Sequence, residues 1–176
     1  ASSNLTSFSN LAGSDTLSLS GTGTISSADV GTGKTVNTSG LTIDNSSGVG
    51  SNYTLSAATV NVTERVIGLS GVRAFDGTNN ASSADLSISN LVSGENLTLS
   101  GSGTVPNATV EMNKAISLGS LSISDGSGGK SSNYTLTGGS HTLDISQVSV
   151  NVNGSWQYGG TKTVDSSDLT LTNLVS

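Results

Sequence analysis

The side chains that could perform chemistry are few, and their spacing fits no known catalytic arrangement. His141 is the single histidine and cysteine is absent, so a Cys–His pair is excluded and a Ser–His–Asp triad would depend on this one residue. The twelve carboxylates do not form the alternating acids and final Glu of a calcium loop. Glycoside hydrolysis needs a spaced carboxylate pair, and the six scattered aromatic residues are too few to line a sugar cleft. We therefore expect no enzyme activity, no cofactor and, among metals, only weak Ca²⁺ between repeats.

Residues 31–35, Gly-Thr-Gly-Lys-Thr, are similar to the end of a phosphate-binding loop. That motif needs a glycine five positions before Gly33, where this sequence has Ala28, and it needs a helix to follow. We expect a strand-entry turn here instead of a nucleotide site.

Two aromatic residues near the C-terminal end are candidates for ligand binding. Trp156 is the only tryptophan, and Tyr158 follows two positions later. An exposed aromatic pair could stack on a sugar, so Trp156 and Tyr158 form a speculative glycan site. The structural alternative is that Trp156 only flanks a turn. Ten Asn-x-Ser/Thr triplets could also carry sugars.

The elements that must position these residues are predicted to be β-strands. The chain is rich in Ser, Thr, Asn and Gly, with 23 Gly, one Pro and 10% charged residues, and its Val, Leu and Ile alternate with polar residues. Alternation buries one face of a strand and leaves the other in water. The net charge of −6 with six scattered basic residues argues against nucleic acid as a partner. No apolar run is long enough for membrane insertion.

An internal repeat, long enough for each copy to form a small domain, runs through the chain. The offset between copies is slightly shorter early in the repeat than late in it. The early matches place Leu17, Leu19, Gly21, Gly23, Lys34 and Leu41 on Leu97, Leu99, Gly101, Gly103, Lys114 and Leu121. The late matches place Leu86, Ile88, Asn90 and Leu91 on Leu169, Leu171, Asn173 and Leu174. Two copies and the start of a third are therefore expected, over residues 1–68, 69–152 and 153–176.

Three motifs recur with the repeat. An aromatic turn opens the second and third copies, and a Lys-containing strand in the middle and a closing Asn-Tyr-Thr-Leu occur in the first and second. The residues that we expect to be structural in these motifs are Phe75, Asp76, Gly77, Tyr158, Gly159, Gly160, Tyr53 and Tyr134. An Asp-Gly pair favours the left-handed backbone of a two-residue hairpin, which we expect at Asp76-Gly77.

These motifs, in this order, resemble the YDG family and its YGX-type (MBG) relatives. The resemblance implies repeats of large, secreted, haemagglutinin-like adhesins at the bacterial cell surface. It implies no catalytic residues. The expected fold is all-β, with tandem β-sandwich-like domains, Ig-like or β-grasp-like, forming an elongated rod. A continuous β-solenoid is the alternative.

The expected function is structural. A stalk of such repeats would project a distal binding region and support cell–cell or biofilm adhesion. The alternative is a module that binds host or matrix glycans or itself. Self-association head to tail is suggested by the opening segment of the third copy, residues 148–176, because the first copy lacks the corresponding opening and an open sheet edge recruits strands.

The rod expectation is testable by small-angle scattering. Tandem domains contact only their neighbours, so the scattering profile should be that of an elongated particle. A radius of gyration near ~16 Å, the value for a compact globule of this length, would contradict it.

Overall fold

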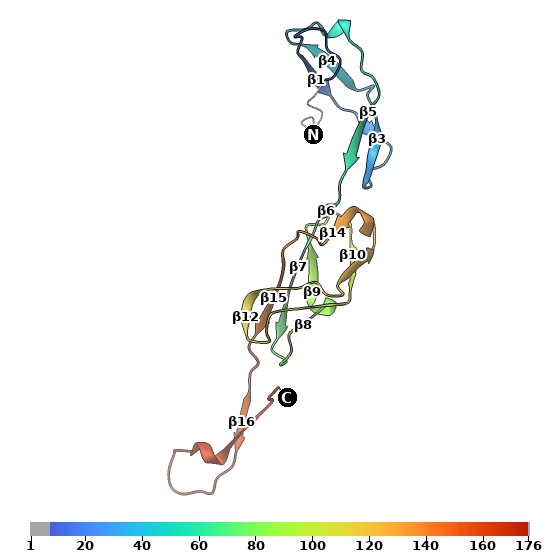
Figure 1. Ribbon diagram of the computed structural model, residues 1–176. Helices are drawn as coiled ribbons and strands as arrows, with labels where there is room; N and C mark the ends of the chain where they lie inside the picture. The colour runs from blue at the N-terminus through green and yellow to red at the C-terminus, as the bar shows by residue number, and fades with distance from the viewer. Residues whose placement is uncertain (1–7, 176) are drawn as a thin grey trace. The chain divides into compact units, whose positions relative to one another are not determined.

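The computed structural model describes residues 8–175, and in them the chain is all-β (Figure 1). None of the helices in this part of the chain is long and apolar enough to cross a membrane. The chain divides into two compact units, Ala1–Glu64 and Arg65–Ser176. This division places the first boundary slightly before the predicted one, and it keeps the start of the third copy within the second unit.

The main sheet of the second unit has four strands, in the order β12-β15-β7-β9. Their bounds are β12 Glu111–Ala115, β15 His141–Ser146, β7 Gly68–Ala74 and β9 Leu86–Ser89. The two outer pairings are antiparallel, but the central pair, β7 and β15, is parallel, from Leu69 opposite His141 to Ala74 opposite Ser146. Immunoglobulin-type sheets are antiparallel, so this mixed sheet differs from the Ig-like form of the predicted β-sandwich-like fold.

Smaller two-stranded sheets complete the second unit. The antiparallel pairs are β8 Asn80–Ser82 with β11 Ser102–Thr104, β10 Leu97–Ser100 with β13 Ser122–Asp125, and β16 Asn151–Gly154 with β17 Leu169–Thr172. The parallel pair is β6 Arg65–Val66 with β14 Tyr134–Thr135. Three short 3₁₀ turns are η2 Ser83–Asp85, η3 Ser131–Asn133 and η4 Ser166–Asp168.

The core of the second unit draws on both ends of the repeat. Leu69 and Leu86 from its first strands pack with Leu143 and Ile145 of its last strand. Leu143 is fully buried because the central strand β15 has neighbours on both edges and the core on one face. The same cluster includes Ala81, Val105, Ile116 and Leu121, and a second cluster joins Ile67, Leu97 and Tyr134.

The first unit repeats the later part of this architecture. It has β1 Leu17–Gly21 paired with β4 Leu41–Asn45, and the three-stranded sheet of β2 Thr24–Ile25, β3 Gly31–Asn37 and β5 Ala58–Val62, with the turn η1 Gly50–Asn52. By the repeat alignment β5 corresponds to β15. Among the described residues β5 pairs with β3 alone, at the edge of its sheet.

Truncating the core at Leu143 tests this packing. Leu143→Ala should lower the free energy of unfolding of the second unit by about 2–5 kcal/mol, the usual cost of a large-to-small change at a buried site. Val72→Ala, on the adjacent strand at a side chain that is 65% exposed, is the control and should change it little. Urea denaturation of both variants measures the difference. Equal effects would contradict the core assignment.

Candidate functional site

The segment that is similar to a phosphate loop lies inside a strand. Residues 31–35 belong to β3, where the pairing with β5 shifts register between Gly31 and Lys34. Gly33 has a φ of +62°, and its N–H donates to Asn61 Oδ1 at 2.8 Å. This β-bulge is followed by strand β4, whereas a phosphate loop needs a helix N-terminus at that point. The expected strand-entry turn is therefore a bulge within the strand.

The second repeat contains the same bulge without the glycine. Asn113 has a φ of +56°, its N–H donates to Asp144 Oδ1 at 2.6 Å, and the register shifts between Glu111 and Lys114. Asn tolerates the left-handed conformation better than most residues. Two different residues thus produce one backbone shape, which places the next side chain, a lysine, on the inner side.

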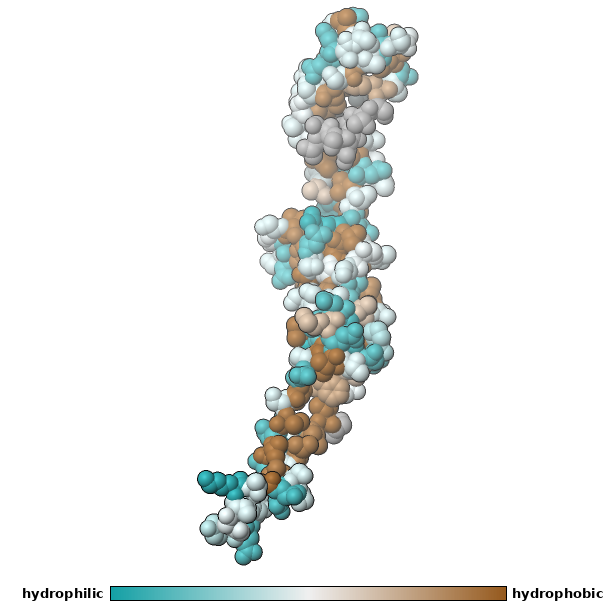
Figure 2. Space-filling model, turned by 90° about the vertical axis from the view of Figure 1, so that its left-hand side faces the viewer, coloured by the Kyte–Doolittle hydropathy of each residue, from teal (hydrophilic) through white to brown (hydrophobic). Residues whose placement is uncertain are grey.

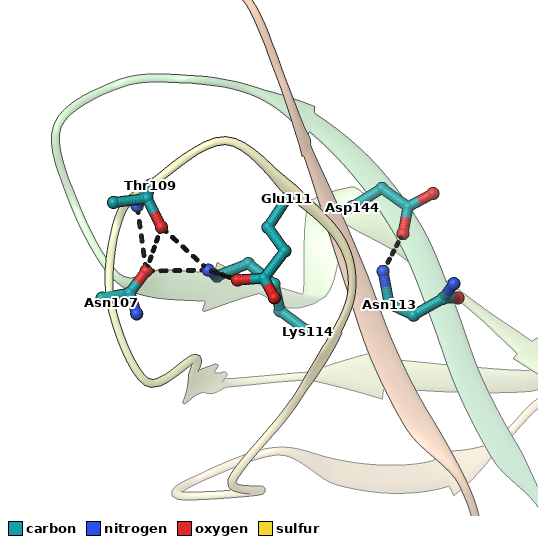
Figure 3. A network of polar contacts seen from close by, with 6 residues as sticks. All are labelled: Asn107, Thr109, Glu111, Asn113, Lys114 and Asp144. Carbon is teal, nitrogen blue, oxygen red and sulfur yellow. Dashed lines mark hydrogen bonds and ion pairs between the residues drawn. The ribbon is translucent and has the colours of Figure 1, made fainter.

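Lys114 is the one buried charged residue of the described chain, and a polar loop surrounds its ammonium group (Figure 3). Its Nζ donates to Asn107 Oδ1 at 2.7 Å, to Thr109 Oγ1 at 3.3 Å and to Glu111 Oε2 at 2.8 Å. A buried ammonium group is costly unless it is paired, so these bonds fix the loop to β12. Lys34 does the equivalent in the first unit, donating to the Ser27 carbonyl at 3.1 Å.

This lysine is a functional residue of the fold that the sequence did not single out. The signal in the sequence was its position, because Lys34 and Lys114 occupy the same place in the two copies of the repeat. The arrangement holds a loop in place and leaves the amine bonded on several sides.

The opening turn of the second repeat is closed by side-chain bonds. Asp76 forms an ion pair with Arg73 and accepts bonds from the N–H and hydroxyl of Thr78 at 2.8 and 2.9 Å. The Arg73 guanidinium, followed by the Thr78 N–H, lowers the pKa of Asp76 to about 2. Gly77 has a φ of +79°, as expected for Asp-Gly. The prediction of a two-residue hairpin at this turn was wrong. The strands on either side of it, β7 and β8, do not pair with each other, because β7 pairs with β9 and β15 while β8 pairs with β11.

The third copy of this turn keeps the glycine with a positive φ but lacks the residues of the ion pair. Gly160 again has a positive φ, +73°, but Gly159 replaces the aspartate and Trp156 replaces the arginine. Trp156 is 51% exposed and Tyr158 is 91% exposed. A groove of the second unit is lined by Phe75, Leu174 and several valines together with the polar residues Gln147, Ser149 and Asn173, and neither Trp156 nor Tyr158 contributes to it. The structure does not bring the two speculative glycan residues into that groove.

The two closing tyrosines are held by the same pair of hydrogen bonds. The Tyr134 hydroxyl donates to Glu95 Oε2 at 2.6 Å and accepts from the Val92 N–H at 3.1 Å. The Tyr53 hydroxyl donates to Asp15 Oδ2 at 2.7 Å and accepts from the Ala12 N–H at 3.1 Å. Burial and the nearby Glu95 raise the pKa of Tyr134. Each tyrosine thus ties the end of its repeat to a turn much earlier in the chain.

His141 begins β15, and it is half-buried. Its Nε2 lies 2.8 Å from the Leu136 carbonyl, and its Nδ1 is buried without a partner. Within residues 8–175 no three acidic or histidine side chains gather where they could hold a metal ion. The lysine and the tyrosine that recur in both units form hydrogen bonds that hold loops and turns in place.

The lowered pKa of Asp76 predicts acid sensitivity. Because this pKa is about 2 in the fold and 3.8 ordinarily, the ionised carboxylate stabilises the fold above pH ~4, and that contribution is lost as the pH falls from ~4 through ~2. Asp76→Asn should flatten the decline in unfolding free energy over this window, as measured by urea denaturation. Glu64→Gln, outside the turn, is the matched loss of one charge. A decline of equal slope in wild type and Asp76→Asn would contradict the ion pair.

Comparison with known proteins agrees with the repeat. The family model described as YDG domain matches the chain twice, over residues 1–61 and 63–143. Neither a search of the curated proteins nor a search of the solved structures found a match. The two matches lie one after the other and together cover most of the chain, so the chain belongs to the YDG domain family.

Proposed function

We propose that this chain is a tension-bearing segment of a stalk, secreted and displayed at a bacterial cell surface as part of an adhesin. Its repeats would project a distal binding region and support cell–cell or biofilm adhesion. Membership of a family of repeat domains supports this role. The repeat supplies packing and loop-fixing bonds at the positions that recur, and the proposal includes no catalytic function.

The observation that carries the proposal is the pairing of the first and last long strands of the repeat. β7 and β15 are parallel neighbours over six residue pairs at the centre of the sheet. The chain enters the repeat at the start of β7 and leaves it at the end of β15, which are opposite ends of this pair. Tension on the chain would therefore pull the two strands past each other along their length.

This geometry loads many bonds at once. The Leu69 N–H donates to the Ser140 carbonyl at 3.0 Å at one end, and the Phe75 N–H donates to the Ser146 carbonyl at 2.9 Å at the other. Sliding the strands must break these bonds and those between them together, and must also pull Leu69 and Leu143 out of the core. Peeling the strands from one end would break the bonds in turn. A stalk unit under tension therefore resists unfolding better when its two strands must slide past each other than when they can peel apart.

Single-molecule force spectroscopy tests this role. The sequence has no cysteine, so handles can be attached at chosen residues. Glu64→Cys with Gln147→Cys pulls β7 and β15 past each other, whereas Asn79→Cys with Gln147→Cys pulls on the same end of both strands. We expect a clearly higher unfolding force for the first pair at the same pulling speed. Equal unfolding forces for the two cysteine pairs would contradict the proposed tension-bearing role.

A further inference from the structure

The groups that meet at the buried Lys114 amine can do more than form hydrogen bonds (Figure 3). The Lys114 side chain is only 1% exposed, and its Nζ lies 2.7 Å from Asn107 Oδ1 and 2.8 Å from Glu111 Oε2. A lysine amine is a nucleophile once it is deprotonated, and a carboxylate in contact with it can take the proton. The Asn107 carboxamide is the electrophile. These three groups are the ones required to form a secondary amide.

The packing of the second unit holds both reacting residues in place. Val105 belongs to the core, and its N–H donates to the Asn79 carbonyl at 2.9 Å, which fixes the loop just before Asn107. Lys114 lies opposite Leu143 in the β12–β15 pairing. Because a C=O bond is ~1.2 Å long, the Lys114 Nζ lies within ~4 Å of Asn107 Cγ. Reacting atoms that are poised for attack lie ~3–3.5 Å apart, so only a small movement is needed.

The carbonyl oxygen of the Asn107 side chain is polarised by Thr109. The Thr109 N–H donates to Asn107 Oδ1 at 3.1 Å, and the Thr109 hydroxyl donates to the same oxygen. Attack on Cγ places negative charge on Oδ1, and fixed donors aimed at such an oxygen stabilise that charge. Thr109 therefore favours attack on this carboxamide.

We propose that Lys114 and Asn107 condense into an intramolecular isopeptide bond. Glu111 takes a proton from the Lys114 ammonium group, the neutral Nζ attacks Asn107 Cγ, and the new C–N bond forms as the Cγ–Nδ2 bond breaks. Nζ gives up two protons in all, one carried by Glu111 to the leaving nitrogen and the other lost to water, so the NH₂ group departs as one ammonium ion. Glu111 ends as a carboxylate, and no oxidant or reductant is consumed. The proposal does not depend on the tension-bearing role.

The outer side of the site is open to water. The Glu111 side chain is 62% exposed. Val110 and Met112, on either side of Glu111, are 46% and 72% exposed, and they belong to the mixed hydrophobic and hydrophilic surface of the second unit in Figure 2. The released ammonium ion can therefore leave directly into solvent, where dilution opposes the reverse reaction.

The first unit has the lysine without the other reacting groups. By the offset of the repeat, Ser27, Asp29 and Gly31 occupy the positions of Asn107, Thr109 and Glu111. Lys34 accordingly donates to the backbone carbonyl of Ser27 and does not contact a side-chain amide there. The isopeptide bond is thus confined to the second unit, and Lys34 is an internal control in the same chain.

Mass spectrometry of the purified full chain tests the bond. We expect the chain to be lighter than its sequence by one ammonia molecule. Trypsin should not cut after Lys114, because the side chain is no longer a cation, so residues 74–130 should appear as one peptide that carries the mass loss. Cleavage after Lys34 should be normal. A peptide of residues 74–114 with the unmodified mass would overturn the proposal.

Three variants assign the mass loss to this pair of residues. Asn107→Ser, which introduces the residue of the first unit, and Glu111→Gln should each keep the full mass and restore cleavage after Lys114. Glu64→Gln, outside the site, should lose ammonia like wild type. Ring closure of Asn107 onto its own backbone would also release ammonia but would leave Lys114 cleavable, and that result would overturn the proposal. Ammonia loss at Lys114 that persists in Glu111→Gln would overturn the role of Glu111.

Discussion

The parallel pairing of β7 with β15 is the contact on which the repeat depends. Parallel strands cannot be joined by a short turn, and here nearly the whole repeat, residues 75–140, forms the connection between them. The pairing therefore encloses the core, because Leu69 on one strand and Leu143 on the other belong to the same cluster. It also bears on the first unit, whose β5 has the position of β15 and in which Val60 and Val62 are half-buried where Leu143 and Ile145 are buried.

Chains this poor in aromatic residues must hold their long connections by polar contacts. The Lys114 ammonium fixes the loop before β12, and the Tyr134 hydroxyl fixes the turn around Glu95. Both devices have counterparts in the first unit, at Lys34 and Tyr53, although the residues that accept their bonds differ. The position and direction of each bond are retained while the partner changes, as expected when the purpose is to restrain the backbone.

Local patterns in the sequence predicted the strands well and the pairing poorly. Alternation located most strands because it depends only on neighbouring residues, and the offset of the repeat identified equivalent positions. Nothing local indicated that β7 would pair with β15, at the other end of the repeat, and the Asp76-Gly77 turn suggested a hairpin that the sheet does not contain. The bulge at Gly33 was hidden for the same reason, since a bulge is defined by the partner strand. The sequence likewise showed that Lys114 recurs, at the position of Lys34, but not that its ammonium group is buried.

Native-state hydrogen exchange on the dilute, monomeric chain tests the central claim most directly. If the β7 pairing closes the repeat, amides of β15 should exchange only when the second unit unfolds, whereas amides of the corresponding strand β5, bonded on one edge, should exchange much faster. Both strands are measured in one sample, so pH and temperature are identical. Equal protection of β5 and β15 would show that the repeat is stable without a β7-like partner and would contradict the account.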